Sequence, residues 1–319
     1  NDPENIVMVK YHMNDRGRPI AVKLNIYNGR SSTLAIPSMR SGSLLANDEG
    51  EAKVAVGYDS ENDFDKIDVH VHGSDGWKML SYPAKGDENI IPVYFDSKKQ
   101  DLYVTSGRET GKKGLYVMNL TTGKSKPIFV HETVDVGDIL MEDGKIVGLV
   151  FENGRPETVV IDKDSKLIQA FKDLQAAFPD ERVAGLHLTK DKKQGIFVTA
   201  SDKNPGTYYK VELGDKIKVT ELTRRMPDLP IEKMGVREPI KLIARDKTPL
   251  HGYVTLPFNK TMKGKLPMIV IPHGGPYGPR DQWLFDPDAQ YFASRGYAVL
   301  QINFRGSGGL WTGLRRSRP

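Results

Sequence analysis

The chain has 319 residues, of which 38% are hydrophobic and 27% charged, a composition typical of a globular protein large enough for two domains. No stretch approaches about 18 consecutive apolar residues and no cysteine is present, so we expect no membrane-spanning helix, no membrane partner, no disulfide and no thiolate chemistry. The net charge of +5 owes three of its charges to Arg315, Arg316 and Arg318, so the rest of the sequence gives no reason to expect a nucleic-acid partner.

The N-terminus leaves the location of the protein unknown. Residues 1–5 do not form a signal peptide, and the chain does not begin with Met, so we expect further sequence upstream. Both the cytoplasm and the periplasm are compatible with the lack of cysteine.

Residues 1–235 consist mainly of short apolar or alternating segments that are separated by Gly, Asp, Asn and Lys, and they show almost no helical periodicity. This pattern predicts a succession of β-strands. The clearest strand-like segments are 53–56, 66–71, 101–105, 114–119, 145–150, 157–161, 195–200 and 207–213.

These segments repeat in pairs. The first strands of the pairs are separated by 48, 44 and 50 residues and contain Val54, Leu102, Ile146 and Ile196. The second strands are separated by 48, 43 and 49 residues and contain Val69, Val117, Val160 and Tyr209. Two series that keep a period near 45 residues are typical of β-propeller blades, whereas a β-sandwich, the alternative, is not expected to keep this period.

At this period, 235 residues hold about five blades, so we expect an incomplete propeller. Residues 173–180 are predicted to form a short helical or irregular connector between blades. Residues 222–238 contain Pro227 and Pro230 and are predicted to form the linker that leaves the propeller.

A second type of pattern begins after this linker. Segments 239–244 and 250–256 are predicted to form a hairpin around the turn at 245–248. Then an apolar strand at 267–272, a helix and a second apolar strand at 297–303 indicate a βαβ unit. Asp286 is the expected N-cap of this helix, Pro287 its first residue and Gly296 its C-cap.

The first strand of this unit runs into His273, Gly274, Gly275 and Pro276. Glycine lets the backbone adopt unusual φ and approach a ligand closely, so the N–H groups of Gly274 and Gly275 could point at an oxyanion. A turn of this type supplies one half of the oxyanion hole in α/β-hydrolases. The alternative is a plain tight turn at the end of a strand.

Three segments together resemble the prolyl oligopeptidase family of serine peptidases, and most closely its acylaminoacyl-peptidase and dipeptidyl-peptidase-like branch. They are residues 273–276, 291–297 and 303–309, and the resemblance is specific over about 239–309. It implies a β-propeller at 1–235, of which the family has about seven or eight blades, followed by the start of an α/β-hydrolase domain at 236–319. It also implies short peptides as substrates, with no metal and no organic cofactor.

The catalytic residues that this mechanism requires are missing from the 319 residues. No serine lies in a G-x-S-x-G elbow, and no histidine follows His273, although the triad of an α/β-hydrolase runs Ser, Asp or Glu, then His. Residues 310–319 form an atypical basic tail without family character. We therefore expect a sequence that is truncated before the catalytic serine and is inactive as it stands.

Other candidate residues have simpler alternatives. His273 is expected to brace the turn by hydrogen bonds rather than act as a base, and Arg305 is expected either to bind a substrate carboxylate or to pair with an acid of the fold. Trp283 and Phe285 are equally compatible with a pocket wall and with a cover for the sheet. Asp68, His70 and His72 share one face of a strand, which fits a solvated face better than a metal site.

Two functions other than a serine peptidase stay open. One is a non-catalytic β-propeller module that binds a peptide or protein, and the other is an esterase or lipase of the α/β-hydrolase type. The repeats disfavour the esterase, because such enzymes do not need a propeller as a size filter.

Overall fold

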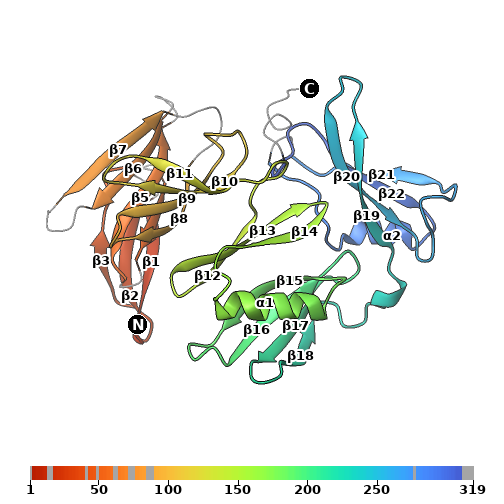
Figure 1. Cartoon of the computed structure of the whole chain (residues 1–319), viewed down its shortest axis with the longest axis horizontal. Coiled ribbons are helices and arrows are strands. Elements are labelled where there is room, and N and C mark those ends of the chain that lie inside the picture. Colours follow the sequence, from red (N-terminus) through yellow and green to blue (C-terminus); the bar gives the residue numbers. More distant parts are fainter. Residues whose placement is uncertain are drawn as a thin grey trace. The chain divides into compact units, whose positions relative to one another are not determined.

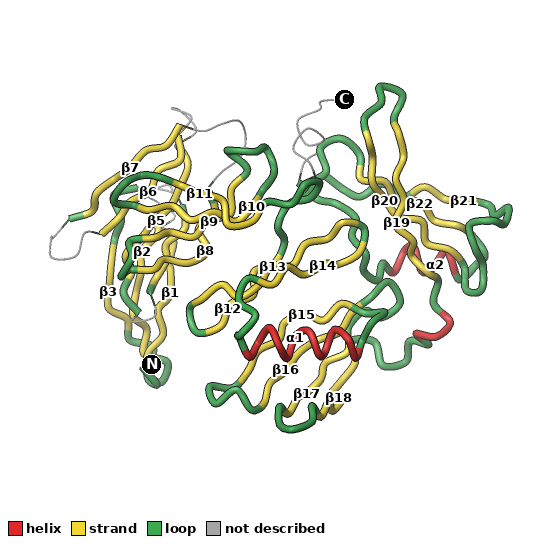
Figure 2. The backbone as a smooth tube through the Cα atoms, viewed as in Figure 1, coloured by secondary structure: helices red, strands yellow, loops and turns green. Residues whose placement is uncertain are grey.

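The computed structural model describes residues 2–12, 17–39, 42–47, 50–59, 64–70, 76–83, 90–275 and 278–310. The chain forms two compact units, Asn1–Val136 and Gly137–Pro319. Figure 2 shows strands and loops along most of the chain and helix in only a few places. None of the helices in the described ranges is long and apolar enough to cross a membrane.

The first unit contains three antiparallel sheets, each built from strands that follow one another in the chain (Figure 1). The first sheet consists of β1 (Asn5–His12), β2 (Arg18–Asn25) and β3 (Ser31–Ala35). The second sheet consists of β4 (Ser43–Ala46), β5 (Ala52–Asp59), β6 (Phe64–His70) and β7 (Trp77–Pro83). The third sheet consists of β8 (Ile91–Asp96), β9 (Asp101–Ser106), β10 (Gly114–Asn119) and β11 (Ser125–Phe129).

The second unit continues this pattern with two more antiparallel sheets. The fourth sheet consists of β12 (Asp138–Glu142), β13 (Lys145–Asn153) and β14 (Arg155–Val160). The fifth sheet consists of β15 (Arg182–Leu188), β16 (Gln194–Ala200), β17 (Thr207–Glu212) and β18 (Lys218–Arg224). The five sheets make a propeller-like, strand-rich fold, as the repeats predict.

The predicted repeat is in phase with these sheets. All four first anchors lie in the second strand of their sheets, and all four second anchors lie in the third strand, from the second sheet to the fifth. Within the second sheet the two anchors are direct partners, Val54 opposite Val69. The period therefore reports a real structural repeat, because equivalent strands recur at equivalent places in successive sheets.

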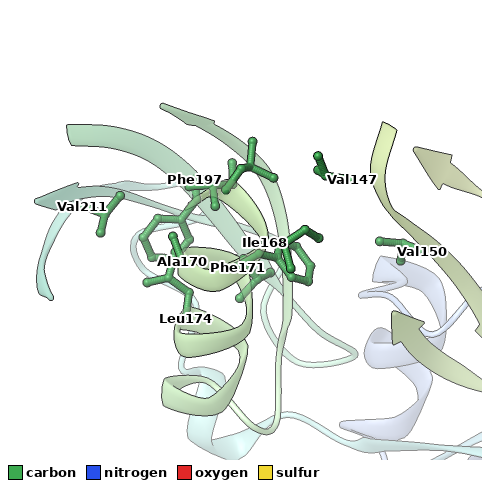
Figure 3. Close-up of a cluster of buried hydrophobic side chains, with 11 residues drawn as sticks. Val147, Val150, Ile168, Ala170, Phe171, Leu174, Phe197 and Val211 are labelled. Atoms are coloured by element: carbon green, nitrogen blue, oxygen red, sulfur yellow. The ribbon is translucent and has the colours of Figure 1, made fainter. Parts of the chain in front are cut away.

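Helix α1 (Lys166–Ala177) follows the fourth sheet. The connector between sheets is therefore helical, as one of the two predicted forms, but its bounds differ from the predicted 173–180. It begins seven residues earlier because Ser165 caps it, accepting a hydrogen bond from Ile168 N–H at 3.2 Å. Leu167, Ile168, Phe171 and Leu174 form one apolar face at helical spacing. Figure 3 shows this face packed with Phe197 and Val211 of the fifth sheet and with Val147 and Val150 of β13.

The sixth sheet has the strand order β19-β20-β22-β21 and combines antiparallel with parallel pairs. Its strands are β19 (Val236–Ile243), β20 (Pro249–Leu256), β21 (Met268–Val270) and β22 (Ala298–Asn303). The chain between β18 and β19, residues 225–235, includes the 3₁₀ helix η2 (Ile231–Lys233). It lies within the linker predicted at 222–238, whose two ends belong instead to these strands. Strands β19 and β20 form the expected hairpin, and β21 runs parallel to β22, as the βαβ pattern requires.

Helix α2 (Pro287–Ala293) lies between β21 and β22 in the chain and starts as predicted. Asp286 accepts a hydrogen bond from Ala289 N–H at 2.8 Å, and Pro287 is the first helical residue. The expected C-cap at Gly296 is wrong by two residues, since Ser294 occupies that position. Gly296 instead takes a φ of 91° in the turn that leads to β22, a conformation that favours glycine.

The compact units divide the chain at residue 136, within the predicted propeller. The fourth, fifth and sixth sheets share a unit because buried hydrogen bonds connect them, including Trp283 N–H to Glu152 and Gln290 to the carbonyl of Asp202. The division into a propeller at 1–235 and a hydrolase part at 236–319 stays a prediction. Of the expected tail at 310–319, only Leu310 lies within the described residues.

Candidate oxyanion turn and its supporting residues

Two glycine turns lie at the same edge of the sixth sheet. Residues 273–275, the first glycine turn, follow β21, and residues 305–309, the second glycine turn, follow β22. Because these strands are parallel neighbours, their carboxyl ends meet, and ligands of open α/β sheets bind at such edges. Pro276, the last residue of the predicted motif, lies outside the described residues.

The second glycine turn is bonded to the chain that follows the first. Gly278 forms an isolated parallel bridge with Ser307, its N–H donates to the carbonyl of Gly306 at 3.0 Å, and its carbonyl accepts from Gly308 N–H at 3.1 Å. A Cβ at Gly308 would lie 2.3 Å from the carbonyl oxygen of Gly278. This contact explains why glycine is needed in the second turn as well as the first.

His273 connects the two glycine turns. Its Nε2 atom lies 2.7 Å from Oγ of the fully buried Ser307, and its Nδ1 atom lies 3.2 Å from the carbonyl oxygen of Gly274. The imidazole also stacks on Phe304 with ring centroids 4.2 Å apart. This is the bracing arrangement that the sequence favours for His273, with both ring nitrogens engaged by the turns.

Gly274 and Gly275 are exposed, and the part of the chain that the structure describes places no hydrogen-bond acceptor on either of their N–H groups. Gly275 has a φ of 83°, and a Cβ there would lie 3.1 Å from Pro279 Cγ. Nothing lies within 4 Å of a Cβ built at Gly274. Among the described residues, the turn therefore leaves two exposed peptide N–H groups without an acceptor, and an oxyanion-binding turn requires such donors.

Arg305 pairs with an acid of the fold. Its Nη2 atom contacts the carboxylate of Asp246, and it lies 3.4 Å from Oγ1 of Thr248, both in the turn between β19 and β20. The Arg305 and Thr248 contacts lower the pKa of Asp246, with backbone and side-chain hydrogen bonds from Thr248 as the largest cause. The guanidinium thus holds the β19–β20 turn beside the second glycine turn.

The segment 278–286, which we call the anchored loop, leads from the first glycine turn to α2 and is held by buried residues. Trp283 is 4% exposed, and its indole N–H donates to the carbonyl of Arg237 at 3.0 Å. Its backbone N–H donates to Oε1 of Glu152 at 2.9 Å. Trp283 is therefore buried under the sheet rather than placed in an open pocket wall.

Arg237 is the largest residue among the fully buried side chains and lies at the centre of this network. Its guanidinium contacts Gln301, lies 3.8 Å from the carboxylate of Asp281 and covers the ring of Tyr253. Burial lowers the pKa of Arg237 and raises that of Asp281, and their mutual attraction opposes both shifts. A charged pair in this position restrains the anchored loop, since breaking it would leave a buried charge uncompensated.

Reasoning from the sequence misses Glu152, Arg237 and Asp281, because their partners lie far away in the chain. One signal was available for Glu152, a carboxylate at the end of the apolar run of β13 and directly before an Asn-Gly turn. Asp68 and His70 lie in β6, but their side chains and the whole of His72 are outside the described residues. In the described ranges, no cluster of three or more His, Cys, Asp or Glu side chains could hold a metal ion.

Comparisons with known proteins identify peptidases. No family model matches the chain. It is 30% identical over 252 residues to dipeptidyl aminopeptidase BIII of Pseudoxanthomonas mexicana, an alignment that covers 76% of this chain and 36% of the relative. It is 23% identical over 242 residues to dipeptidyl peptidase family member 6 of Caenorhabditis elegans, covering 69% of this chain and 32% of the relative.

Solved structures show the same fold. A puromycin-hydrolyzing peptidase of Mycobacterium tuberculosis aligns with a TM-score of 0.66 and 19% identity, over 93% of this chain and 47% of that one. A puromycin hydrolase aligns with a TM-score of 0.64 and 17% identity over the same shares. The chain thus spans about a third of the length of these curated relatives and about half of these structures. These relatives and the shared fold support a peptidase of the prolyl oligopeptidase family, as the sequence motifs predict.

Proposed function

We propose that this protein is a serine-type peptidase for short peptides and that Gly274 and Gly275 supply part of its oxyanion hole. The observation that carries this proposal is the pair of exposed peptide N–H groups at the carboxyl end of a parallel strand, to which the described residues offer no acceptor. During acyl transfer the carbonyl oxygen of the scissile bond gains negative charge, and fixed N–H donors stabilise that charge. The relatives named as dipeptidyl peptidases agree with a short peptide substrate.

The anchored loop and the second glycine turn hold the proposed oxyanion donors, Gly274 and Gly275, in a fixed position. The donors can lower the barrier only if they point at the oxyanion before the reaction begins, because reorientation during the reaction would cost free energy. The imidazole of His273 and the backbone bonds of Gly278 hold the two glycine turns together. His273 and Arg305 thus act as positioning residues in this proposal, without direct contact to the reacting atoms.

The remaining catalytic groups lie outside these 319 residues in our proposal. A serine in a G-x-S-x-G elbow would supply the nucleophile and the second oxyanion N–H, and an acidic residue and a histidine would complete the triad. We therefore propose that the 319 residues alone do not hydrolyse peptides. We also propose that the five sheets are blades of a larger propeller that restricts access to oligopeptides.

Sequencing the gene through and beyond the codons for residues 305–319 is the first test. A reading frame that supplies G-x-S-x-G, then Asp or Glu, then His would support the proposal. A genuine end of the reading frame at Pro319, together with peptide binding but no hydrolysis, would favour the non-catalytic binding module.

Kinetics of the natural gene product then test the oxyanion turn. Gly275→Ala strains a backbone with a φ of 83°, so we expect kcat to fall about 10²–10³-fold with a much smaller change in KM. Gly264→Ala is the matched control, because a Cβ at Gly264 would meet only an ordinary contact at 3.7 Å. Equal effects of the two substitutions would contradict the assignment.

A further inference from the structure

Asn303, the last residue of β22, is almost completely buried, with 2% of its surface exposed. Its Oδ1 atom accepts a hydrogen bond from the N–H group of Asp281 at 2.7 Å, and its Nδ2 atom donates to the carbonyl of Asp281 at 3.1 Å. We call these two bonds the amide clasp. They satisfy both backbone groups of a buried residue in the anchored loop, as a neighbouring strand would do in a sheet.

The clasp is the first buried contact that the anchored loop makes after the first glycine turn. Gly278 and Pro279 are exposed and Arg280 is half-buried, whereas Asp281 is buried. Pro279 and Arg280 also bond to the second glycine turn, through a carbonyl that accepts from Gly308 N–H at 3.3 Å and a guanidinium that donates to the carbonyl of Gly309 at 3.1 Å. Water can compete for bonds near the surface but not for the buried clasp, so the clasp is the most rigid of these contacts.

Contacts around the clasp hold the first glycine turn from both sides. Before the turn, His273 stacks on Phe304, the residue that directly follows β22. After the turn, Pro279 lies beside Gly275, since a Cβ built at Gly275 would be 3.1 Å from Pro279 Cγ. Asp281 follows Pro279 by two residues. The clasp therefore fixes the piece of chain against which Gly275 rests.

We propose that Asn303 is a positioning residue of the oxyanion turn: its amide fixes Asp281 and thereby the direction of the Gly275 N–H group. This inference rests on the proposed function, and Asn303 itself does not touch the reacting atoms. Donors to an oxyanion are effective only when they are placed before the reaction, and a misplacement of about 1 Å can cost about 10²-fold in rate. Loss of the clasp should therefore lower kcat and leave KM nearly unchanged.

Kinetics of the natural gene product test this role. Asn303→Ala should lower kcat per active site at least about tenfold, with KM within about twofold of wild type. Active sites are counted by titration with a serine-directed fluorophosphonate, so that a loss of folded protein is not mistaken for a loss of kcat. Asn119→Ala in the third sheet is the matched control, because the Asn119 amide also accepts from a backbone N–H, that of Thr122 at 3.0 Å, and donates to Asp101 at 2.9 Å.

Hydrogen exchange of the 319-residue chain tests the clasp without any activity. Asn303→Ala removes both partners of the Asp281 backbone, so the Asp281 amide should exchange at least about tenfold faster than in wild type. Asn303→Asp has nearly the same shape and keeps an oxygen for this N–H group, so its exchange rate should lie between the two. It also serves for the kinetics where the alanine variant does not fold.

The outcomes separate this inference from the proposed function. Wild-type kcat per active site in the Asn303 variants, unchanged exchange at Asp281, or an equal loss of kcat in Asn119→Ala would overturn the positioning role and leave the proposed function in place. A natural gene product that neither hydrolyses peptides nor reacts with the fluorophosphonate would overturn both.

Discussion

Ser307 is fully buried, and in the described part of the chain its hydroxyl has one hydrogen-bond partner, Nε2 of His273. In the sequence this serine lies directly between Gly306 and Gly308, so its spacing differs from the G-x-S-x-G motif of a nucleophile elbow. Its burial excludes a role as nucleophile in this structure, since a fully buried hydroxyl cannot attack a substrate. It holds the two glycine turns together through the imidazole.

Replacement of His273 tests this pair at the level of single residues. His273→Ala leaves the Ser307 hydroxyl buried without a partner, so we expect a loss of about 1–3 kcal/mol in the free energy of unfolding. Ser307→Ala removes the hydroxyl together with its need for a partner and should cost less. Urea denaturation of both single variants and of the double variant gives the coupling energy. Additive effects would show that the two side chains do not support each other.

His251 should make stability depend on pH. Burial and the charges of Lys241 and Arg280 lower its pKa in the folded state below the ordinary value near 6.5. Glu152 and His251 line one cavity of the second unit. The unfolded chain therefore takes up the proton more readily, so the contribution of His251 is complete above about pH 6.5 and is lost as pH falls through its folded pKa. His251→Gln should reduce the fall in Tm between pH 7.5 and pH 5.

Thermal melts of both proteins across this pH range give the measurement. The comparison needs the difference between wild type and variant, because other groups also titrate in this range. Identical slopes of Tm against pH would exclude His251 as a contributor.

At the scale of elements, α1 depends on two caps from different parts of the chain. Ser165 accepts from Ile168 N–H at 3.2 Å, and Glu142 of β12 accepts from Leu167 N–H at 3.1 Å. Local sequence supplies the first cap, and only the packing of the helix against the fourth sheet supplies the second. The helix fills the space between the fourth and fifth sheets with its apolar face (Figure 3).

Ser165→Ala removes the local cap and leaves the N–H of Ile168 without its acceptor. We expect a loss of about 1 kcal/mol in the free energy of unfolding. Ser165→Asp, which keeps a capping oxygen, is the control and should stay close to wild type. Both variants can be compared by urea denaturation followed by circular dichroism, and equal losses would show that the cap contributes nothing.

At the scale of the whole molecule, the sixth sheet depends on the sheets that precede it. Asp202 of the fifth sheet's β16–β17 turn accepts from Arg237 N–H at 2.7 Å, and Glu152 accepts from the anchored loop. In the described residues, β21 pairs only with β22, and its side chains Met268 and Val270 are each 57% exposed. An exposed apolar edge strand is a site for association with other chains.

We therefore expect residues 236–319, expressed alone, to self-associate. Their N–H groups at Trp283 and Arg237 lose the acceptors Glu152 and Asp202, which leaves these donors unsatisfied in addition to the open edge. Size-exclusion chromatography with light scattering over a concentration series gives the measurement. A monodisperse fragment that melts cooperatively would contradict this expectation.

A charge on the edge strand should reduce this association in the full chain as well. Val270→Lys places a lysine in β21, whereas Ile196→Lys, the control, alters a side chain of similar exposure (55%) in β16, which is paired on both sides. We expect only Val270→Lys to lower the apparent mass at high concentration. An equal effect of both lysines would indicate general surface charge rather than the edge as the cause.

Local sequence patterns were enough to predict the features that depend on neighbouring residues. The alternation and period of apolar residues predicted the strands that contain Val54, Leu102 and Val117, and Asp286 with Pro287 marked the start of α2. The glycines of both turns could be recognised because a small set of backbone conformations requires glycine. The family resemblance rests on the same local motifs.

Contacts between residues that are far apart in the sequence could be identified only from the folded chain. Glu152 and Trp283 are 131 residues apart, and Arg237 and Gln301 are 64 apart, so no local pattern could pair them. The start of α1 has a local signal in Ser165, whereas its second cap, from Glu142, depends on the packing of the helix against the fourth sheet. Long-range hydrogen bonds and burial are properties of the folded arrangement, and they decided how the candidate oxyanion turn is held.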